Sequence, residues 1–551
     1  MNLIIIIKIF MISLEGSNIL FLFYLDCVMV LFEVLLGGDF MLELVHIYLT
    51  LNQDNRPLIK DLSFVLSSHD KVAIIGEEGN GKSTLLKFIY DSSLVEGYCT
   101  CAGEVISHNY KIGYLEQFLD SRWNHDSVLN YFLKSSPEAE IDYEKYNLFG
   151  DLLKIIVKMG FNEDILEENY MISYLSGGEK VKLQLCKLLL EKNDILLLDE
   201  PTNDLDIETL RWLEDFIINS KQPIIFVSHD ETLLENTANT IIHLEQLKKK
   251  SDSSYTIAKI GYKEYVRTRL RKIENQNQQA AGELRNYKAE VQTLKQIKSK
   301  VQLANPGRTN RMNSLLAQEK KLEERTLTHK ADVEEAINIQ FRPDISIPNG
   351  KMVLDLELDD LKVGDRVLAK DISLSVQGPE HIVIVRQNGA GKTTLVKSIY
   401  EVLKIRDDIR LGYMPQNYED LLNSNQKAID FLKTESFSES YIRSFMGNMK
   451  FTRDEMLSFI KELSGGQKAK LLLMKMILDD CNVLLLDEPT RNLSPLSNPI
   501  IRDVLTNYHG TIISVSHDRK YIKEVCQKAY WFDEGGLRQI SIEDAVAGKR
   551  P

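Results

Sequence analysis

The sequence predicts an α/β chain of two repeated domains joined by an α-helical hairpin. Three observations lead to this prediction. A short apolar strand runs directly into a glycine-rich phosphate-binding motif at Gly76–Ser83, and a helical pattern follows it. The same series of strands and motifs recurs in the second half of the chain. Between the halves lies a polar segment whose apolar residues follow the 3,4 spacing that is typical of paired helices.

The composition is that of a large globular protein without a disulfide framework. The chain has 551 residues, enough for two or three domains, and a formal net charge of −13. Its six cysteines are scattered, and Cys99 and Cys101 form a lone C-x-C with no second pair at metal-binding spacing. Neither disulfides nor a zinc site are indicated, which fits a reducing cytosol.

The N-terminal stretch is strongly apolar at Leu3–Phe10 and Ile19–Leu36, as a signal or membrane helix would be. However, Asp26 and Glu33 interrupt the longer run, and no basic cluster precedes either one. A charge in mid-membrane costs about 2.5–3.5 kcal/mol. We favour an extension before a working start at Met41, and a membrane anchor is the alternative.

The first phosphate-binding motif follows a series of predicted strands. Strands are expected at Leu42–Leu51, near Leu62–Val65 and at Val72–Ile75, where the last leads into G-x-x-x-x-G-K-S. The glycines let backbone N–H groups approach phosphate oxygens, and the helix that follows directs its positive end at them. Lys82 is predicted to reach the β- and γ-phosphates, and Ser83 to bind Mg²⁺. The candidate nucleotide-binding residues are Gly76, Gly79, Asn80, Gly81, Lys82, Ser83 and Thr84.

Two later apolar strands end in polar residues. One ends at Asp199 and Glu200, and Pro223–Val227 ends at Ser228-His229-Asp230. Continuous apolar runs are typical of buried parallel strands, and ligands bind at the carboxyl ends of such strands. Asp199 is therefore predicted to hold Mg²⁺ and Glu200 to polarise the attacking water. His229 is the candidate sensor of the γ-phosphate.

The second half repeats these features at equal spacings. A similar loop begins at Arg386, one strand leads to Asp487-Glu488, and another leads to His517. Both halves contain Leu-Ser-Gly-Gly, with 23 residues from its Ser to the strand-end Asp and 29 from the Glu to the His. Chance does not produce four motifs and two equal spacings, so we infer a duplication. The second loop contributes Asn388, Gly389, Ala390, Gly391, Lys392, Thr393 and Thr394.

The segment Lys248–Pro348 predicts an antiparallel helical hairpin. A heptad seam, with Asn277 and Lys298 filling its gaps, continues until Asn305-Pro306-Gly307 ends the helix. A weaker helical pattern then runs from Met312 to Ile337. The apolar or small residues of the seam are Leu270, Ile273, Ala280, Leu284, Tyr287, Val291, Leu294 and Val301.

The hairpin has the opposite charge to the chain. Tyr262–Gln340 contains 16 Lys and Arg against 10 Asp and Glu, a net charge of +6. This predicts a polyanion partner, with nucleic acid as the best candidate; a solvated coiled coil with a chance charge bias is the alternative. Most of the excess lies near the tip, where a single acid, Glu290, accompanies Arg285, Lys288, Lys295, Lys298, Lys300, Arg308 and Arg311.

At these motifs the chain resembles the ATP-binding-cassette (ABC) ATPases. Gly76–Ser83 resembles the Walker A loop, Ile195–Asp199 the Walker B strand, and Leu-Ser-Gly-Gly the signature. Two cassettes, no membrane domain and a charged helical linker are similar to the ABC-F family of ribosome-associated translation ATPases. Pro201–Asp206 resembles that family's run after Walker B, with Asp204 where a His is usual. The resemblance adds the Q-loop residues Gln117 and Gln416, and the signature residues Ser176, Gly177, Gly178, Ser464, Gly465 and Gly466.

The resemblance implies two ATP molecules with Mg²⁺, held head to tail between the cassettes. The Lys82 site would face Ser464 and Gly466, and the Lys392 site would face Ser176 and Gly178. Closure on ATP is expected to move the hairpin. The catalytic candidates are Glu200, His229, Glu488 and His517, and the Mg²⁺ candidates are Ser83, Asp199, Thr393 and Asp487.

Two features favour the antibiotic-resistance subgroup, whose members protect the ribosome from lincosamides, streptogramin A and pleuromutilins. Glu488–Ser497 resembles those members. Housekeeping members usually insert a helical arm between the Q-loop and the signature of cassette one. Here that interval is 59 residues against 48 in cassette two, too little extra for an arm. The linker tip is expected to reach toward the peptidyl-transferase centre of the ribosome, near 23S rRNA and the P-site tRNA.

Three other functions stay open: a housekeeping translation factor, a transporter ATPase and a DNA-repair clamp. A basic coiled coil between two cassettes argues against the last two. Two departures predict a slower second site, because Arg386 stands where the first Gly belongs and Ser494 where cassette one has Asp206.

The chain is expected to be a cytoplasmic monomer without a membrane partner, in which the two cassettes form an internal pseudo-dimer. Its predicted divisions are residues 1–40, an apolar extension; 41–247, cassette one; 248–348, the linker with its basic tip; 349–540, cassette two; and 541–551, a C-terminal tail.

Overall fold

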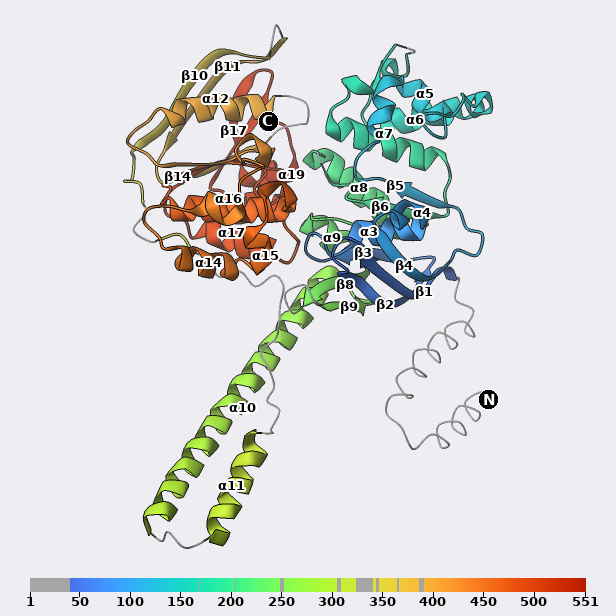
Figure 1. Ribbon diagram of the computed structural model, residues 1–551. Helices are drawn as coiled ribbons and strands as arrows, with labels where there is room; N and C mark the ends of the chain where they lie inside the picture. The colour runs from blue at the N-terminus through green and yellow to red at the C-terminus, as the bar shows by residue number, and fades with distance from the viewer. Residues whose placement is uncertain are drawn as a thin grey trace, which may run out of the picture.

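The computed structural model contains two α/β lobes side by side, and a long helical hairpin projects away from them (Figure 1). The apolar N-terminal stretch and the predicted turn at the linker tip lie outside the described residues. The structure describes residues 40–167, 169–203, 205–247, 252–304, 309–323, 340–342, 346–363, 366–385 and 391–551.

A six-stranded sheet of order β5-β6-β7-β3-β8-β9 forms the centre of the first lobe. Its first five strands are parallel, and every residue of β3 and β6 is buried, as their unbroken apolar sequences predict. A three-stranded antiparallel sheet, β2-β1-β4, accompanies it. The strands are β1 (Phe40–Leu51), β2 (Pro57–Ser67), β3 (Lys71–Ile75), β4 (Cys99–Ile106), β5 (Ile112–Leu115), β6 (Ile195–Asp199), β7 (Ile224–Val227), β8 (Thr240–Leu247) and β9 (Asp252–Ala258).

Helices of the first lobe cover its main sheet. The phosphate loop leads into α3, and the signature leads into α7. The helices are α3 (Lys82–Tyr90), α4 (Ser93–Glu96), α5 (Val128–Leu133), α6 (Phe149–Lys158), α7 (Gly177–Leu190), α8 (Ile207–Asn219) and α9 (Glu231–Thr237), with 3-10 turns η1 (Ser121–His125), η2 (Tyr143–Leu148), η3 (Glu163–Leu166) and η4 (Ile172–Tyr174).

The second lobe repeats this topology in the order β13-β14-β15-β12-β16-β17. The equivalent strands occupy equivalent places, which confirms the predicted fold class of two α/β domains joined by a helical linker. Its strands are β10 (Met352–Val363), β11 (Arg366–Gln377), β12 (His381–Val385), β13 (Leu411–Met414), β14 (Val483–Asp487), β15 (Thr511–Val515), β16 (Lys528–Asp533) and β17 (Gly536–Ile540). Its helices are α12 (Lys392–Lys404), α13 (Ala428–Leu432), α14 (Glu439–Asn448), α15 (Arg453–Leu457), α16 (Gly465–Leu478), α17 (Asn498–Thr506), α18 (Arg519–Val525) and α19 (Ile542–Ala547), with η5 (Tyr418–Asp420) and η6 (Ile460–Glu462).

Two predicted boundaries differ from the observed elements. β9 pairs with β8 as the antiparallel edge of the first sheet, so this lobe continues past the predicted end at residue 247. Composition placed β9 in the linker because an edge strand of Asp, Ser and Thr looks like a polar linker. In the predicted C-terminal tail, α19 packs against α18 and against α8 of the first lobe.

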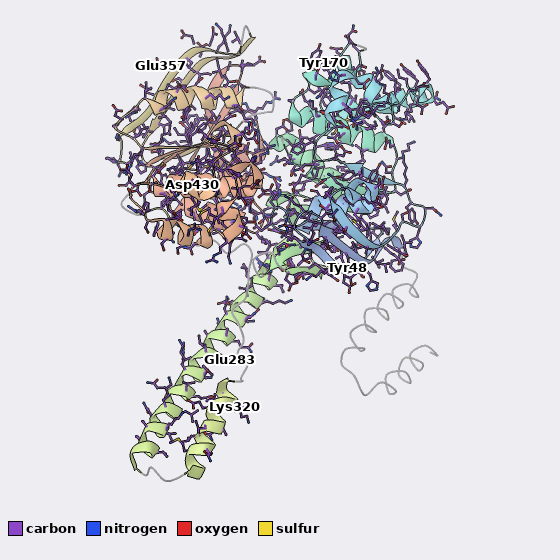
Figure 2. The ribbon with its side chains drawn as sticks, in the orientation of Figure 1. Tyr48, Tyr170, Glu283, Lys320, Glu357 and Asp430 are labelled. Atoms are coloured by element: carbon purple, nitrogen blue, oxygen red, sulfur yellow. The ribbon has the colours of Figure 1, made fainter. Side chains whose placement is uncertain are left out.

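The hairpin consists of α10 (Tyr262–Ala304) and α11 (Thr309–Glu323). Ala280 is buried in the predicted seam, and the Lys298 ammonium lies 2.6 Å from the carboxylate of Glu319 on α11. Two other residues of the predicted seam, Leu270 and Leu284, are 60% and 44% exposed. Figure 2 shows Glu283 on α10 and Lys320 on α11, both far from the two lobes. Within the described ranges, no helix combines the length and the apolar character that a membrane span needs.

Candidate functional site

The first phosphate loop, Gly76–Ser83, connects the carboxyl end of β3 to α3. Gly76 has a φ of 147°, and a Cβ there would lie 2.3 Å from the carbonyl oxygen of Leu244, so glycine is required. Lys82 is buried, and its Nζ donates to the carbonyl oxygens of Gly76 (2.9 Å) and Glu77 (3.1 Å). An ammonium held over a glycine-rich loop at a helix N-terminus is suited to bind phosphate.

Oxygen donors for a cation gather beside this loop. The Ser83 hydroxyl donates to Oδ1 of Asp199 (2.9 Å), and the Tyr114 hydroxyl donates to Oδ2 (3.2 Å). Burial raises the pKa of Asp199 to about 6. In the second lobe, Oδ2 of Asp487 is buried and lacks a hydrogen-bond partner among the described residues. Hydroxyl and carboxylate oxygens are the ligands that Mg²⁺ prefers, so the pair of Ser83 and Asp199 fits Mg²⁺, and the Asp487 carboxylate offers a donor of the same kind.

Each candidate catalytic glutamate follows its strand with a left-handed backbone. Glu200 has a φ of 49° and Glu488 a φ of 54°. Non-glycine residues in this conformation are strained by about 1–3 kcal/mol and cluster at functional sites. Nε2 of His229 lies 2.9 Å from Oε1 of Glu200. Burial tends to raise the pKa of Glu200, but His229 and Lys82 outweigh it, and the pKa is lowered.

The second site has the same residues in a different arrangement. Lys392 Nζ contacts Nε2 of His517, and burial together with this ammonium holds the pKa of His517 well below its usual value. Burial raises the pKa of Glu488 to about 7, and Asp487 adds to the rise. The Thr393 hydroxyl lies 3.4 Å from Oε1 of Gln416. In the second site the lysine ammonium thus contacts the histidine, whereas in the first site the histidine contacts the glutamate.

Both signature motifs cap a helix. Ser176 caps α7 in a capping box with Glu179, and Ser464 caps α16 in a capping box with Gln467. A Cβ on Gly466 would lie 2.6 Å from the carbonyl oxygen of Asn492, which explains the glycine there. Each signature thus presents backbone N–H groups at a helix N-terminus.

The first phosphate loop faces the signature of the second lobe through two acids, Glu77 and Glu78. The N–H of Gly465 donates to Oε1 of Glu78 (3.1 Å), and that of Gly466 donates to Oε2. Glu77 accepts hydrogen bonds from Ser494 and Ser497 of the second lobe, and the Lys470 ammonium lies 3.4 Å from it. This is the head-to-tail pairing predicted for the Lys82 site.

The signature of the first lobe, Ser176–Gly178, was predicted to face the Lys392 site. Across the residues that the structure describes, no hydrogen bond joins Ser176–Gly178 to the second lobe. Instead, a cavity between the lobes is lined by strand-end residues of both, including His229 and Asp230 from the first lobe and Lys392, Glu488 and His517 from the second. This cavity places the strand ends of the two lobes opposite each other.

A buried cluster of ion pairs joins the lobes beside these sites. Arg502 bonds Glu231 at 2.5 Å, and both side chains are at most 5% exposed. Arg519 pairs with Glu214 and lies 3.2 Å from Asp230. Lys520 contacts Glu231 (3.0 Å), so basic residues of the second lobe meet acids of the first.

Most predicted site residues lie at strand ends or helix starts of their lobe. Gln117 follows β5 and is half-buried, and the exposed Gln416 follows β13. Asn388, Gly389 and Ala390 lie outside the described residues. The sequence analysis did not single out four residues of this contact between the lobes: Glu77, Glu78, Lys470 and Ser497. Two adjacent acids inside a loop that binds anionic phosphate are unusual, and they could have indicated a further role for the loop.

The comparisons with known proteins agree with this architecture. A family model described as ABC transporter matches residues 59–203 and 369–491. The ATP-binding protein Uup of Buchnera aphidicola (Acyrthosiphon pisum) is 29% identical, over 90% of this chain and 81% of that protein. ABC transporter F family member 5 of Arabidopsis thaliana is 27% identical, over 88% and 74%.

Solved structures show the same fold at lower identity. An archaeal ribosome recycling factor, in complex with a ribosomal stalk protein, has a TM-score of 0.57 and 16% identity, with 90% of both chains covered. A structure described as RNase-L Inhibitor has a TM-score of 0.55 and 17% identity, again over 90% of both chains.

Fold, motifs and matches define the class: the chain carries two tandem ABC ATPase domains joined by a helical linker. Its similarity to the relatives above extends over nearly all of its length. In its sequence the chain is similar to ABC transporter F proteins such as the Arabidopsis thaliana relative.

Proposed function

We propose that the chain hydrolyses ATP at the interface of its lobes and uses this reaction to control binding of its hairpin to the ribosome. The observation that supports this most is the contact of the first phosphate loop with Gly465 and Gly466. It puts the residues for binding ATP on one lobe and the closing helix on the other. The cytoplasm, where ribosomes lie, is the proposed location.

The first site supplies the groups that hydrolysis needs. Lys82 binds the β- and γ-phosphates, and Ser83 with Asp199 would hold Mg²⁺, which neutralises phosphate charge when bound. Glu200 is ionised and orients the attacking water, while His229 fixes the carboxylate by its 2.9 Å contact. The N-terminus of α16 stabilises the charge that develops on the transferred phosphate.

The hairpin is the proposed RNA-binding element. α10 has 43 residues, and at about 1.5 Å per residue it extends about 60 Å, long enough to enter a deep cleft. Lys288, Lys295 and Lys300 are exposed on it and can hold RNA phosphates. Lys298 instead pairs with Glu319 and belongs to the hairpin seam.

Within this function we propose antibiotic resistance by ribosomal protection, of the lincosamide, streptogramin A and pleuromutilin type. The tip of the hairpin would reach the peptidyl-transferase centre, near 23S rRNA and the P-site tRNA. The segment between Gln117 and Ser176 supports this choice, because its described residues form short helices and turns within the lobe rather than a protruding arm (Figure 1).

Growth of a susceptible host that expresses the chain, across a panel of ribosome-targeting antibiotics, tests this proposal. We expect raised inhibitory concentrations for those three drug classes, lost on deletion of 303–307. Lys295→Gln with Lys300→Gln should weaken ribosome binding and lower its salt slope by about 0.7–0.9 for each RNA phosphate that is no longer neutralised. Unchanged inhibitory concentrations for every drug would refute the resistance function.

A housekeeping role in translation is the second candidate. The relatives above are named only as ATP-binding or ABC transporter F proteins, and the archaeal recycling factor shares the two-lobed fold. In that case the chain would bind ribosomes in an ATP-dependent way and alter growth or stalling without any drug. Drug-free ribosome profiles of a deletion strain separate the two candidates.

A further inference from the structure

The segment Ser494–Ser497 of the second lobe contacts the first lobe at successive residues. The Ser494 hydroxyl donates to Oε1 of Glu77 (2.5 Å), and the Ser497 hydroxyl donates to the same atom. The Pro495 carbonyl accepts a hydrogen bond from the Tyr262 hydroxyl (3.1 Å). Leu496 packs against the core cluster that contains Tyr262. Four consecutive residues therefore bridge the first phosphate loop and the first residue of α10.

Both ends of this bridge are firmly held. The Glu77 side chain is 15% exposed, and its carboxylate is ionised at neutral pH, since Lys470 and the two serines overcome the effect of burial and lower its pKa to about 2. Tyr262 is 2% exposed. The Ser494 hydroxyl also accepts a hydrogen bond from the N–H of Ser497 (3.1 Å), which keeps the segment rigid. A displacement of Glu77 would therefore move the Ser494–Ser497 segment, and with it the Pro495 carbonyl that bonds Tyr262.

Within the first lobe, the root of the hairpin is also anchored to β8, the strand that contacts the first phosphate loop. The Tyr265 hydroxyl lies 2.8 Å from Nδ1 of His243, and Arg269 contacts Glu245 at 2.8 Å, both on β8. Between these two anchors, the carbonyl of Leu244 accepts a hydrogen bond from Asn80 (3.0 Å). The first turns of α10 are therefore fixed to the strand that supports the same loop.

The equivalent position of the first lobe is arranged differently. Asp206, which corresponds to Ser494, accepts hydrogen bonds from the N–H (2.9 Å) and the hydroxyl (2.6 Å) of Thr209 within α8. The second phosphate loop has Gln387 and Asn388 where the first has two acids. The acid–serine contact is thus a feature of the first site.

We propose that Ser494–Ser497 is a relay that transmits ATP binding at the first site, rather than at the second, to the hairpin. Glu77 and Tyr262 are its two positioning residues, and neither touches the reacting atoms. Phosphate that enters the first loop repels the Glu77 carboxylate, the two serines follow it, and the Pro495 carbonyl moves against Tyr262. This inference rests on the proposed function, because it takes ATP as the ligand of the first site.

The test measures hairpin position by fluorescence transfer between dyes at two exposed residues, Asn275 on α10 and Ser440 on α14. The full chain is titrated with ATP and, separately, with ADP. Tyr262→Phe removes only the hydroxyl that reaches the second lobe. Tyr265→Phe is the matched control, since its hydroxyl contacts His243 inside the first lobe.

In Tyr262→Phe, loss of one buried hydrogen bond should shift the ATP-dependent hairpin equilibrium by about threefold to tenfold, with basal ATP hydrolysis at the parental rate. Tyr265→Phe should keep the parental shift. Lys82→Ala should abolish the shift, whereas Lys392→Ala should keep it. Equal effects of Tyr262→Phe and Tyr265→Phe, equal effects of the two lysine variants, or no ATP-dependent shift in the parent would overturn the relay. Failure of the proposed function is distinct, because the parent would then lack ATP hydrolysis or ribosome binding.

Discussion

The two nucleotide sites are built from the same motifs, yet different residues meet them across the interface. In the first, Glu78 contacts the opposite signature, Glu77 contacts the Ser494–Ser497 segment, and His229 lies 2.9 Å from Glu200. In the second, Lys392 contacts His517, and Glu488 has a raised pKa. Duplicated motifs thus give equivalent folds, while residues between the motif positions set the state of each site.

The largest expected difference is catalytic. Glu200→Gln should lower ATP hydrolysis by about 100-fold or more, because it removes the ionised group that orients water. Glu488→Gln should have a much smaller effect, since the second site is predicted to contribute less. Single-turnover assays measure both, with binding of a fluorescent ATP analogue as the control. Equal residual rates would mean that the two sites are functionally alike.

The buried ion pairs between the lobes are expected to stabilise the interface at which both sites lie. Arg502→Met removes the buried guanidinium from Glu231 while the Lys520 ammonium stays 3.0 Å away, so we expect a loss of about 1.5–3 kcal/mol. Lys298→Met is the control, because it breaks the hairpin pair with Glu319 and should cost about 1 kcal/mol or less. Urea unfolding measures both. A smaller loss for Arg502→Met than for Lys298→Met would show that the cluster does not hold the lobes together.

Residues exchanged from the second phosphate loop into the first should remove the difference between the two sites. Glu77→Gln with Glu78→Asn removes charge-assisted hydrogen bonds to Gly465 and Ser494, worth about 1.5–3 kcal/mol each. The contact between the lobes at the first site should weaken, and the single-turnover rate of that site should approach that of the second. The rates are compared in the Glu488→Gln and Glu200→Gln backgrounds respectively. An unchanged first-site rate would argue against a role for the acids.

A smaller effect concerns the pH dependence of stability, for which we consider one buried histidine in each lobe other than the two candidate catalytic histidines. Burial lowers the pKa of His243 and of His381, so both are neutral when folded. Because the unfolded chain binds more protons below about pH 6.5, their stabilisation is full above that value and is lost as pH falls toward the folded pKa, by at most about 1.4 kcal/mol per pH unit for each group. His381→Gln should therefore flatten the pH dependence of unfolding between pH 6.5 and 5. An identical slope in parent and variant would assign the dependence to other groups.

The sequence was sufficient to predict elements that depend on interactions between neighbouring residues in the chain. Strands such as Val72–Ile75 are continuous apolar runs, and the phosphate loop needs glycine at Gly76, so both were recognisable. The polar edge strand β9 was not, because its stability comes from pairing with β8. The role of Ser494 was also missed, since its partner Glu77 lies 417 residues away in the chain.

The central claim is that ATP at the lobe interface controls ribosome binding through the hairpin. Cosedimentation of the Glu200→Gln, Glu488→Gln double variant with ribosomes, in ATP and in ADP, tests it most directly. We expect the variant to bind ATP without hydrolysing it and to stay on the ribosome in ATP, whereas ADP should release it. Equal binding in both nucleotides would contradict the account.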